Sequence, residues 1–172
     1  MALPEIISGR VWKLGDHVNT DLLHPPSQFS LDEKRMKEGI AEGMVRLGLE
    51  VKGDSSDEGW IIVAGENFGC GSSRETSVRG LFAFGVKGVV ATSFARIFMR
   101  SLINVGIPVF ESGEIQECVK DGELIQISLG GGWIEGQDSK RFSFSPLDSH
   151  LKRILEEGGL MAYLKSEKKD SY

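Results

Sequence analysis

The sequence has few of the side chains that build metal sites or disulfide frameworks. Its 172 residues include two cysteines, Cys70 and Cys118, and three histidines. The cysteines do not form a Cys-x-x-Cys pair, which is the spacing that zinc sites and iron–sulfur clusters commonly use. The chain alone therefore cannot assemble a cluster or a zinc site. We expect no metal ligands in it, and the spacing of the histidines assigns none of them to catalysis.

Long apolar runs and an excess of positive charge are also missing. No stretch approaches the ~20 apolar residues of a membrane span, and the first residues lack the charged-then-apolar pattern of a secretory signal. The net charge is −5, without a basic patch, which argues against a nucleic-acid partner. We therefore expect a cytoplasmic protein without a nucleic-acid or membrane partner.

What the sequence does have is an alternation of strand-like and helix-like segments. Its 172 residues, 40% of them hydrophobic, fit one domain, so we expect a single domain over 1–172 with a loose tail at 166–172. Turn signals beyond residue 111 predict short antiparallel strands and then a helix that ends at the glycine pair 158–159. Before them, a β-α-β-α-β order predicts the α/β class with a parallel sheet. Its segments are strand 60–64, helix 76–84, strand 89–92, helix 94–105 and strand 107–110.

The most informative segment is residues 65–76, which read GENFGCGSSRET. Three glycines precede a predicted helix start, where free backbone N–H groups and the positive end of the helix dipole favour an anion. Two hydroxyls and a guanidinium, from Ser72, Ser73 and Arg74, stand at that place. This combination predicts a site for a carboxylate or a phosphate beside a hydroxyl. Since no Gly-Lys-Ser/Thr follows at the required spacing, the segment is not a P-loop.

A purely structural interpretation of the same residues stays open. Ser72 and Glu75 have the Ser-x-x-Glu spacing of a capping box, which satisfies N–H groups at a helix start without any ligand. Capping explains neither the three glycines nor Arg74 at a helix start, where the dipole disfavours a cation. From the residues alone, anion binding and capping are equally supported.

Residues 65–75 resemble the active-site loop in the separately encoded small subunits of the aconitase superfamily. That group includes the small subunits of 3-isopropylmalate dehydratase and homoaconitase. Three further segments are similar to motifs of the family and occur in its order: GDHVNTD at 15–21, TSFARIF at 92–98 and ILEEGGL at 154–160. Together the segments cover nearly the whole chain. The resemblance implies a swivelling β/β/α domain of the aconitase C-terminal type.

The resemblance also implies an enzyme activity that the chain shares with a partner. Such hydro-lyases dehydrate and rehydrate a hydroxy-dicarboxylic acid, and their 4Fe-4S cluster belongs to a large subunit. We therefore expect this chain to bind no cofactor itself, to be inactive alone and to form a heterodimeric site with that large subunit. Whether the isolated chain self-associates stays open.

The matching motif implies a role for each residue of the loop. Ser72 would be the catalytic base, and N–H groups of the loop would stabilise its alkoxide. Arg74 would clamp a substrate carboxylate through paired N–H bonds. Ser73 would add a hydrogen bond to the substrate, and Asp21 would be a nearby orienting acid.

The residues expected to contact the substrate side group depart from the family pattern. After the Thr-Asp pair, the family typically runs through a proline and a basic residue to Tyr-Leu. Here Ser27 replaces the basic residue, and Gln28 and Phe29 replace Tyr-Leu, so we predict Gln28 and Phe29 as substrate-binding residues. 3-Isopropylmalate, an intermediate of leucine biosynthesis, is the leading substrate. A subunit of homoaconitase or of dimethylmaleate hydratase is the alternative, and a non-catalytic anion-binding module is a third interpretation.

Overall fold

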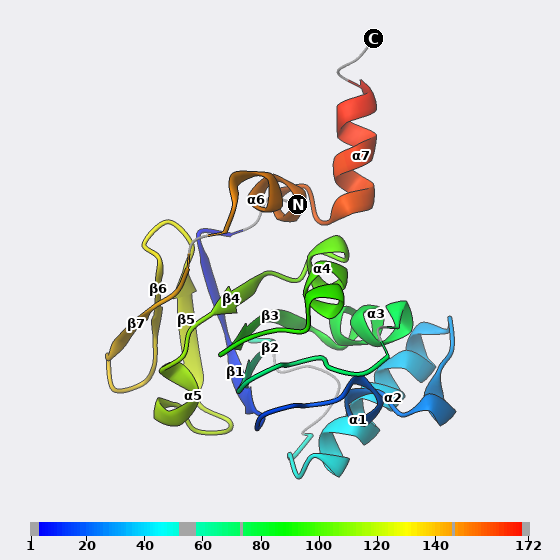
Figure 1. The fold of residues 1–172 in the computed structure, drawn as a ribbon, viewed down its shortest axis with the longest axis horizontal. Helices are drawn as coiled ribbons and strands as arrows, with labels where there is room; N and C mark the ends of the chain where they lie inside the picture. The colour runs from blue at the N-terminus through cyan, green and yellow to red at the C-terminus, as the bar shows by residue number, and fades with distance from the viewer. Residues whose placement is uncertain (1–3, 52–57, 73, 146, 170–172) are drawn as a thin grey trace.

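The fold is built on one seven-stranded β-sheet with the strand order β4-β3-β2-β1-β5-β6-β7 (Figure 1). The structure, a computed structural model, describes residues 4–51, 58–72, 74–145 and 147–169. Four strands are parallel: β1 (Ile6–Lys13), β2 (Trp60–Ala64), β3 (Val86–Ala91) and β4 (Val109–Glu111). Three are antiparallel: β5 (Leu124–Ser128), which pairs with β1, β6 (Trp133–Glu135) and β7 (Arg141–Ser143). The predicted mixture of a parallel core and antiparallel additions is confirmed.

Helices lie on both faces of this sheet. The larger hydrophobic core lies under α2 (Glu33–Arg46), α3 (Glu75–Phe84) and α4 (Arg96–Asn104). The smaller core lies under α5 (Ile115–Cys118). Two short elements, α1 (Thr20–Leu23) and the 3-10 helix η1 (Pro26–Gln28), connect β1 to α2. Among the described helices, none is long and apolar enough to cross a bilayer.

The two cores follow from the alternation of side chains along the strands. On β2, Trp60 and Ile62 point into the larger core, whereas Ile61 and Val63 point into the smaller one. All five residues of β2 are buried, as expected for a central parallel strand with helices on both faces. Trp60 stacks on Trp12 of β1 with ring centroids 4.3 Å apart.

Several element boundaries differ from the predicted ones, and contacts of the chain explain two of them. Strand β3 begins at Val86 instead of 89, because Gly85 ends α3 in a left-handed conformation (φ 95°) and the chain pairs with β2 at once. Helix α4 begins at Arg96 instead of 94, because Phe94 forms a bridge with Phe68 and the backbone N–H of Ala95 donates to the Phe68 carbonyl.

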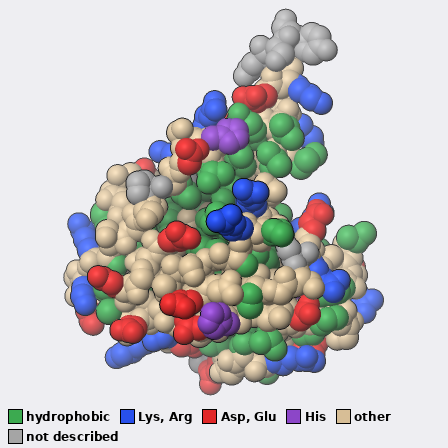
Figure 2. All heavy atoms as spheres, in the orientation of Figure 1, with side chains coloured by type: hydrophobic (Ala, Val, Ile, Leu, Met, Phe, Trp, Pro, Cys, Tyr) green, Lys and Arg blue, Asp and Glu red, His purple; other side chains and the backbone are tan. Residues whose placement is uncertain are grey.

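The chain ends in two helices, of which only the first was predicted. Helix α6 (Ser149–Glu156) packs against α4, and α7 (Leu160–Lys169) projects away from the sheet (Figure 1). Figure 2 shows hydrophobic side chains gathered on this projecting part, where Met161 and Leu164 are exposed. Within the segment expected as a loose tail, residues 166–169 form the last turn of α7, and 170–172 lie outside the described residues.

Candidate active site

Three loops meet at the carboxyl edge of the parallel strands. They follow β1, β2 and β3, and backbone pairing joins them: Asn19 bridges Cys70, and Phe68 bridges Phe94. The backbone N–H of Gly69 also donates to the Val18 carbonyl, at 3.0 Å. The segments 15–21 and 65–72, which the sequence analysis singled out separately, therefore form one structure.

Glycines of the central loop make room for groups of the chain itself. A Cβ on Gly65 would collide with the carboxylate of Asp16, which accepts the N–H of Glu66 at 2.8 Å. Gly71 has a φ of +94°, and a Cβ there would lie 2.6 Å from the Asn19 side chain. The sequence analysis interpreted these glycines as part of an anion site. The close approach that the structure shows is by neighbouring loop residues.

The predicted capping box is wrong. Helix α3 begins at Glu75, its N-cap residue is Arg74, and no side-chain cap bond forms there among the described residues. Ser72 lies before the cap and is exposed. Glu75 instead pairs with Arg79 one turn along the helix, at 2.6 Å. Ser72 therefore does not cap α3, and it precedes the N-cap residue by two positions.

Arg74 joins two of the other predicted site residues. Its Nε lies 3.8 Å from Oδ1 of Asp21, and its guanidinium carbon lies 4.6 Å from the centre of the Phe29 ring. These contacts bring together residues from the segments after β1, before α2 and before α3. The Arg74 side chain keeps 44% of its surface exposed, so its remaining N–H groups can reach a ligand.

Gln28 and Ser73 are the two remaining predicted site residues. The side-chain amide of Gln28 donates to Oε2 of Glu42 at 2.8 Å, which ties the loop to α2. This hydrogen bond, aided by Arg46, lowers the pKa of Glu42. The structure thus directs the Gln28 side chain to α2, without a contact to Arg74 in the described part of the chain. Ser73 lies outside the described residues.

Sequence reasoning missed two residues beneath the loop. Thr20 is fully buried, and its hydroxyl donates to the carbonyl oxygen of Ser72 at 2.7 Å. The side chain of Asn19 accepts the N–H of Asp21 at 2.8 Å and caps α1. A signal for this turn was present in the GDHVNTD segment at 15–21. Consecutive Asn, Thr and Asp residues are typical of a turn that is held by its own side chains.

A buried histidine lies behind Phe29. His24 is fully buried and meets the Phe29 ring edge-on at 5.1 Å. Neither of its ring nitrogens has a well-formed hydrogen bond within the described residues. Burial lowers the pKa of His24 by more than the nearby backbone of Gln28 raises it. The neutral ring is therefore the form that fits the folded chain.

We expect the stability of the chain to fall in mild acid because of His24. As the pH falls below the ordinary histidine pKa of 6.5, the unfolded chain takes up the proton before the folded chain does. The free energy of unfolding then falls by up to ~1.4 kcal/mol per pH unit. Urea unfolding from pH 8 to pH 5 measures this slope. A His24→Asn variant should show a flatter dependence of unfolding free energy on pH. The control variant His150→Gln, at an exposed position, should keep the wild-type slope. Parallel profiles for wild type and His24→Asn would refute the assignment.

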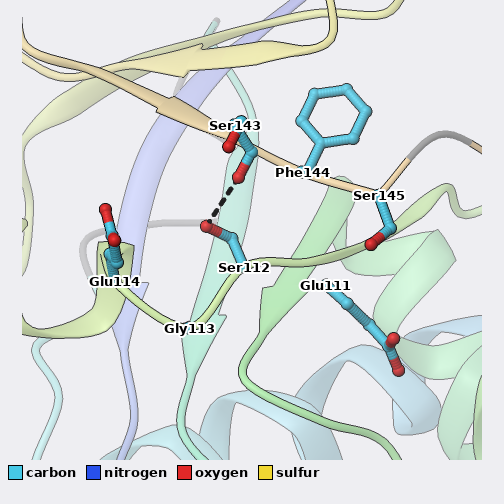
Figure 3. Close-up of a pocket in the computed structure, with 7 residues that line it drawn as sticks. All are labelled: Glu111, Ser112, Gly113, Glu114, Ser143, Phe144 and Ser145. Atoms are coloured by element: carbon cyan, nitrogen blue, oxygen red, sulfur yellow. Dashed lines mark hydrogen bonds between the residues drawn. The ribbon is translucent and has the colours of Figure 1, made fainter.

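A cavity lies away from these residues. It has a volume of about 430 Å³ and lies between the loop after β4 and the end of β7 (Figure 3). Its lining includes the carboxylates of Glu111 and Glu114, and the Ser112 hydroxyl donates to the Ser143 carbonyl at 3.1 Å beside it. Two carboxylates repel a dicarboxylate, so the Arg74 region is the better place for an anionic substrate.

Metal-ligating groups do not gather in the described part of the chain. No three His, Cys, Asp or Glu side chains there are arranged to hold an ion. Cys70 lies in the loop after β2 and donates its S–H to the His17 carbonyl at 3.2 Å, whereas Cys118 ends α5. Both thiols are free, and two thiols on separate elements do not fit an iron–sulfur cluster.

Comparison with known proteins places these features in context. A family model for the aconitase C-terminal domain matches residues 34–111. The 3-isopropylmalate dehydratase small subunit 1 of Thermotoga maritima is 41% identical over 161 residues, which are 93% of this chain and 95% of that protein. The isopropylmalate/citramalate isomerase small subunit of Methanocaldococcus jannaschii is 40% identical over 168 residues, 96% of this chain and 98% of that protein. The crystal structure of 3-isopropylmalate dehydratase from the same organism matches with a TM-score of 0.83 at 37% identity, covering 96% of this chain and 97% of that chain.

Proposed function

Because this chain belongs to the family of 3-isopropylmalate dehydratase small subunits, we propose that it supplies half of an active site that dehydrates and rehydrates a hydroxy-dicarboxylic acid. Its homologues are small subunits of hydro-lyases and isomerases. One observation carries the proposal. The guanidinium of Arg74 lies within reach of both Asp21 and Phe29, and the exposed Ser72 precedes Arg74 by two residues in the same loop.

Ser72 is the proposed base. Dehydration requires removal of a proton from carbon next to a carboxylate, and a serine hydroxyl is a weak base at neutral pH. Its alkoxide needs fixed dipoles around it. Helix α3 begins at Glu75, three residues after Ser72, and we assign to its N-terminal N–H groups and the positive end of its dipole the task of stabilising that alkoxide.

Arg74 is the proposed clamp for a substrate carboxylate. A guanidinium offers five N–H donors in a planar fork that matches both oxygens of a carboxylate. The 3.8 Å separation from Asp21 is longer than a hydrogen bond, so Asp21 orients the guanidinium while leaving its donors available. We give Ser73 a hydrogen bond to the same substrate.

Phe29 is the proposed contact for the side group of the substrate. Its ring is apolar and packs on Arg74, so a branched apolar group attached beside the clamped carboxylate would meet an aromatic surface. The isopropyl group of 3-isopropylmalate has this character, which supports a role in leucine biosynthesis. Gln28 then anchors the loop through Glu42. Citramalate is the second candidate, because the Methanocaldococcus jannaschii relative carries that substrate in its name.

A large subunit is the proposed partner. The relatives are named small subunits, which implies a larger one. The described residues do not fit an iron–sulfur cluster, so we assign the 4Fe-4S cluster of this family to that partner, where it supplies Lewis acidity at the substrate hydroxyl. The residues of this chain bind the carboxylate, exclude water from beside it and move the proton at carbon.

We expect turnover only from the assembled pair. The chain is expressed with and without its large subunit, the complex is isolated by size exclusion, and dehydration of 3-isopropylmalate, citramalate, homocitrate and dimethylmalate is followed by absorbance of the unsaturated acid. The complex should be active, with the highest kcat/KM on 3-isopropylmalate.

The four substrates separate the alternatives. If kcat/KM were highest on citramalate, the substrate would be citramalate and the hydro-lyase activity would stand. If kcat/KM were highest on homocitrate, the result would favour a homoaconitase subunit. Turnover by this chain alone would contradict the shared site. An assembled complex that dehydrates none of the four acids would overturn the proposed function.

A further inference from the structure

Thr20 is a buried polar residue directly beneath the catalytic loop. Few polar side chains of the described chain are fully buried, and Thr20 has no exposed surface. A buried hydroxyl must find a partner, because an unpaired one is costly. The partner here is the carbonyl oxygen of Ser72, at 2.7 Å and 52 residues along the chain. The hydroxyl is thus bonded to the main chain of the proposed base.

The main chain of Thr20 holds the same loop at a second point. Its backbone N–H donates to the Cys70 carbonyl at 3.0 Å. The two hydrogen bonds from Thr20 therefore flank Gly71, whose positive φ turns the loop between them. Thr20 is itself fixed, because Asn19 caps α1 just before it and bridges Cys70.

This arrangement controls the direction in which the Ser72 side chain leaves the loop. Rotation of the Ser72 main chain would break the bond from Thr20, and with it the direction of Oγ would change. A base must lie within hydrogen-bonding reach of the proton that it removes, and a misplacement of about 1 Å can cost ~100-fold in rate.

We propose that Thr20 is a positioning residue for Ser72: its hydroxyl, acting through the Ser72 carbonyl, holds the base in line with the substrate. The inference rests on the proposed function, since it requires Ser72 to be the base. Thr20 does not touch the substrate. Thr20 therefore affects the rate of the chemical step, whereas substrate affinity depends on Arg74.

Kinetics of three variants in the complex with the large subunit test the proposal. Thr20→Val removes the donor at nearly constant volume and should lower kcat by about 10- to 100-fold, with KM within about threefold. Thr20→Ser restores the donor and should restore kcat. The control is Ser112→Ala, which removes another buried hydroxyl that donates to a distant carbonyl, at the cavity beyond β4, and should leave kcat unchanged.

A second measurement needs only the isolated chain. In a Cys118→Ser background, the rate of Cys70 alkylation reports how tightly the loop is held, because Cys70 is part-buried and bonded to His17. Thr20→Val should raise this rate severalfold, and Thr20→Ser and Ser112→Ala should not. If Thr20→Val does not fold, Thr20→Ala takes its place, since it also lacks the donor.

The outcomes distinguish this inference from the function on which it rests. A normal kcat for Thr20→Val, while Ser72→Ala is inactive, would overturn positioning and leave the proposed function standing. Equal losses of kcat in Thr20→Val and Ser112→Ala would reduce Thr20 to general stability and also overturn it. Normal turnover by Ser72→Ala would remove the base itself and with it this inference, while the hydro-lyase activity of the complex would stand.

Discussion

Ser72→Ala is expected to lower kcat of the assembled enzyme by at least about 100-fold, with KM little changed. The variant removes the oxygen that we propose takes the proton and leaves the proposed Arg74 clamp in place. It should also leave thermal stability nearly unchanged, because α3 begins at Glu75 and Ser72 makes no cap bond to it. Loss of a true N-cap would instead cost about 1 kcal/mol. Steady-state kinetics and thermal melting, both with the partner present, measure the two effects.

An exposed serine elsewhere gives the control for this variant. Ser145 lies at the cavity beyond β4 and is also exposed, so Ser145→Ala should leave both kcat and the melting temperature near wild type. If Ser72→Ala showed normal turnover with a lowered melting temperature, the serine would be structural, and its assignment as the base would fall.

Arg74→Lys should lower kcat/KM by about 100-fold or more, because lysine keeps the charge but loses the planar fork that binds a carboxylate through two parallel hydrogen bonds. The ammonium would also lose the stacked arrangement over Phe29 that the guanidinium has at 4.6 Å. Much of the loss should appear as a higher KM, since the clamp already acts in the bound substrate. Initial rates over a range of substrate concentrations separate the two constants.

An arginine-to-lysine substitution on α3, Arg79→Lys, provides the comparison. Arg79 lies on α3, is exposed and pairs with Glu75, and an exposed pair of this kind contributes little. Arg79→Lys should therefore leave kcat/KM within about threefold of wild type. If the two variants lost activity equally, the loss would not be specific to Arg74, and the bidentate clamp would be excluded.

The parts of the fold that the sequence predicted are those set by local patterns. The apolar run at β2 and the turn signals after residue 111 required no knowledge of distant residues. The start of α4 could not be predicted in this way, because Phe94 has helix-compatible neighbours but pairs with Phe68, far away in sequence. Helix α7 was missed because Gly158 and Gly159 end one helix and lead directly into another.

The candidate site shows the same division. Ser72 and Arg74 were found because a glycine-rich loop before a helix is a local signal, and their grouping with Asp21 and Phe29 came only through the family resemblance. Gln28 was paired with Phe29 in sequence, yet its amide bonds to Glu42 on α2, a contact that depends on how helix and loop pack. Thr20 was overlooked because its role depends on a partner 52 residues away.

The joining of the loops after β1, β2 and β3 has a consequence for binding of the proposed large subunit. Because these loops are paired to one another by backbone bridges, their ordering entropy is lost when the chain folds and not when the partner binds. On the proposed function, we expect this chain to bring a formed half of the site to its partner, without folding of these loops coupled to binding. We then expect the rate of association to be set by the encounter of the two subunits and their relative orientation.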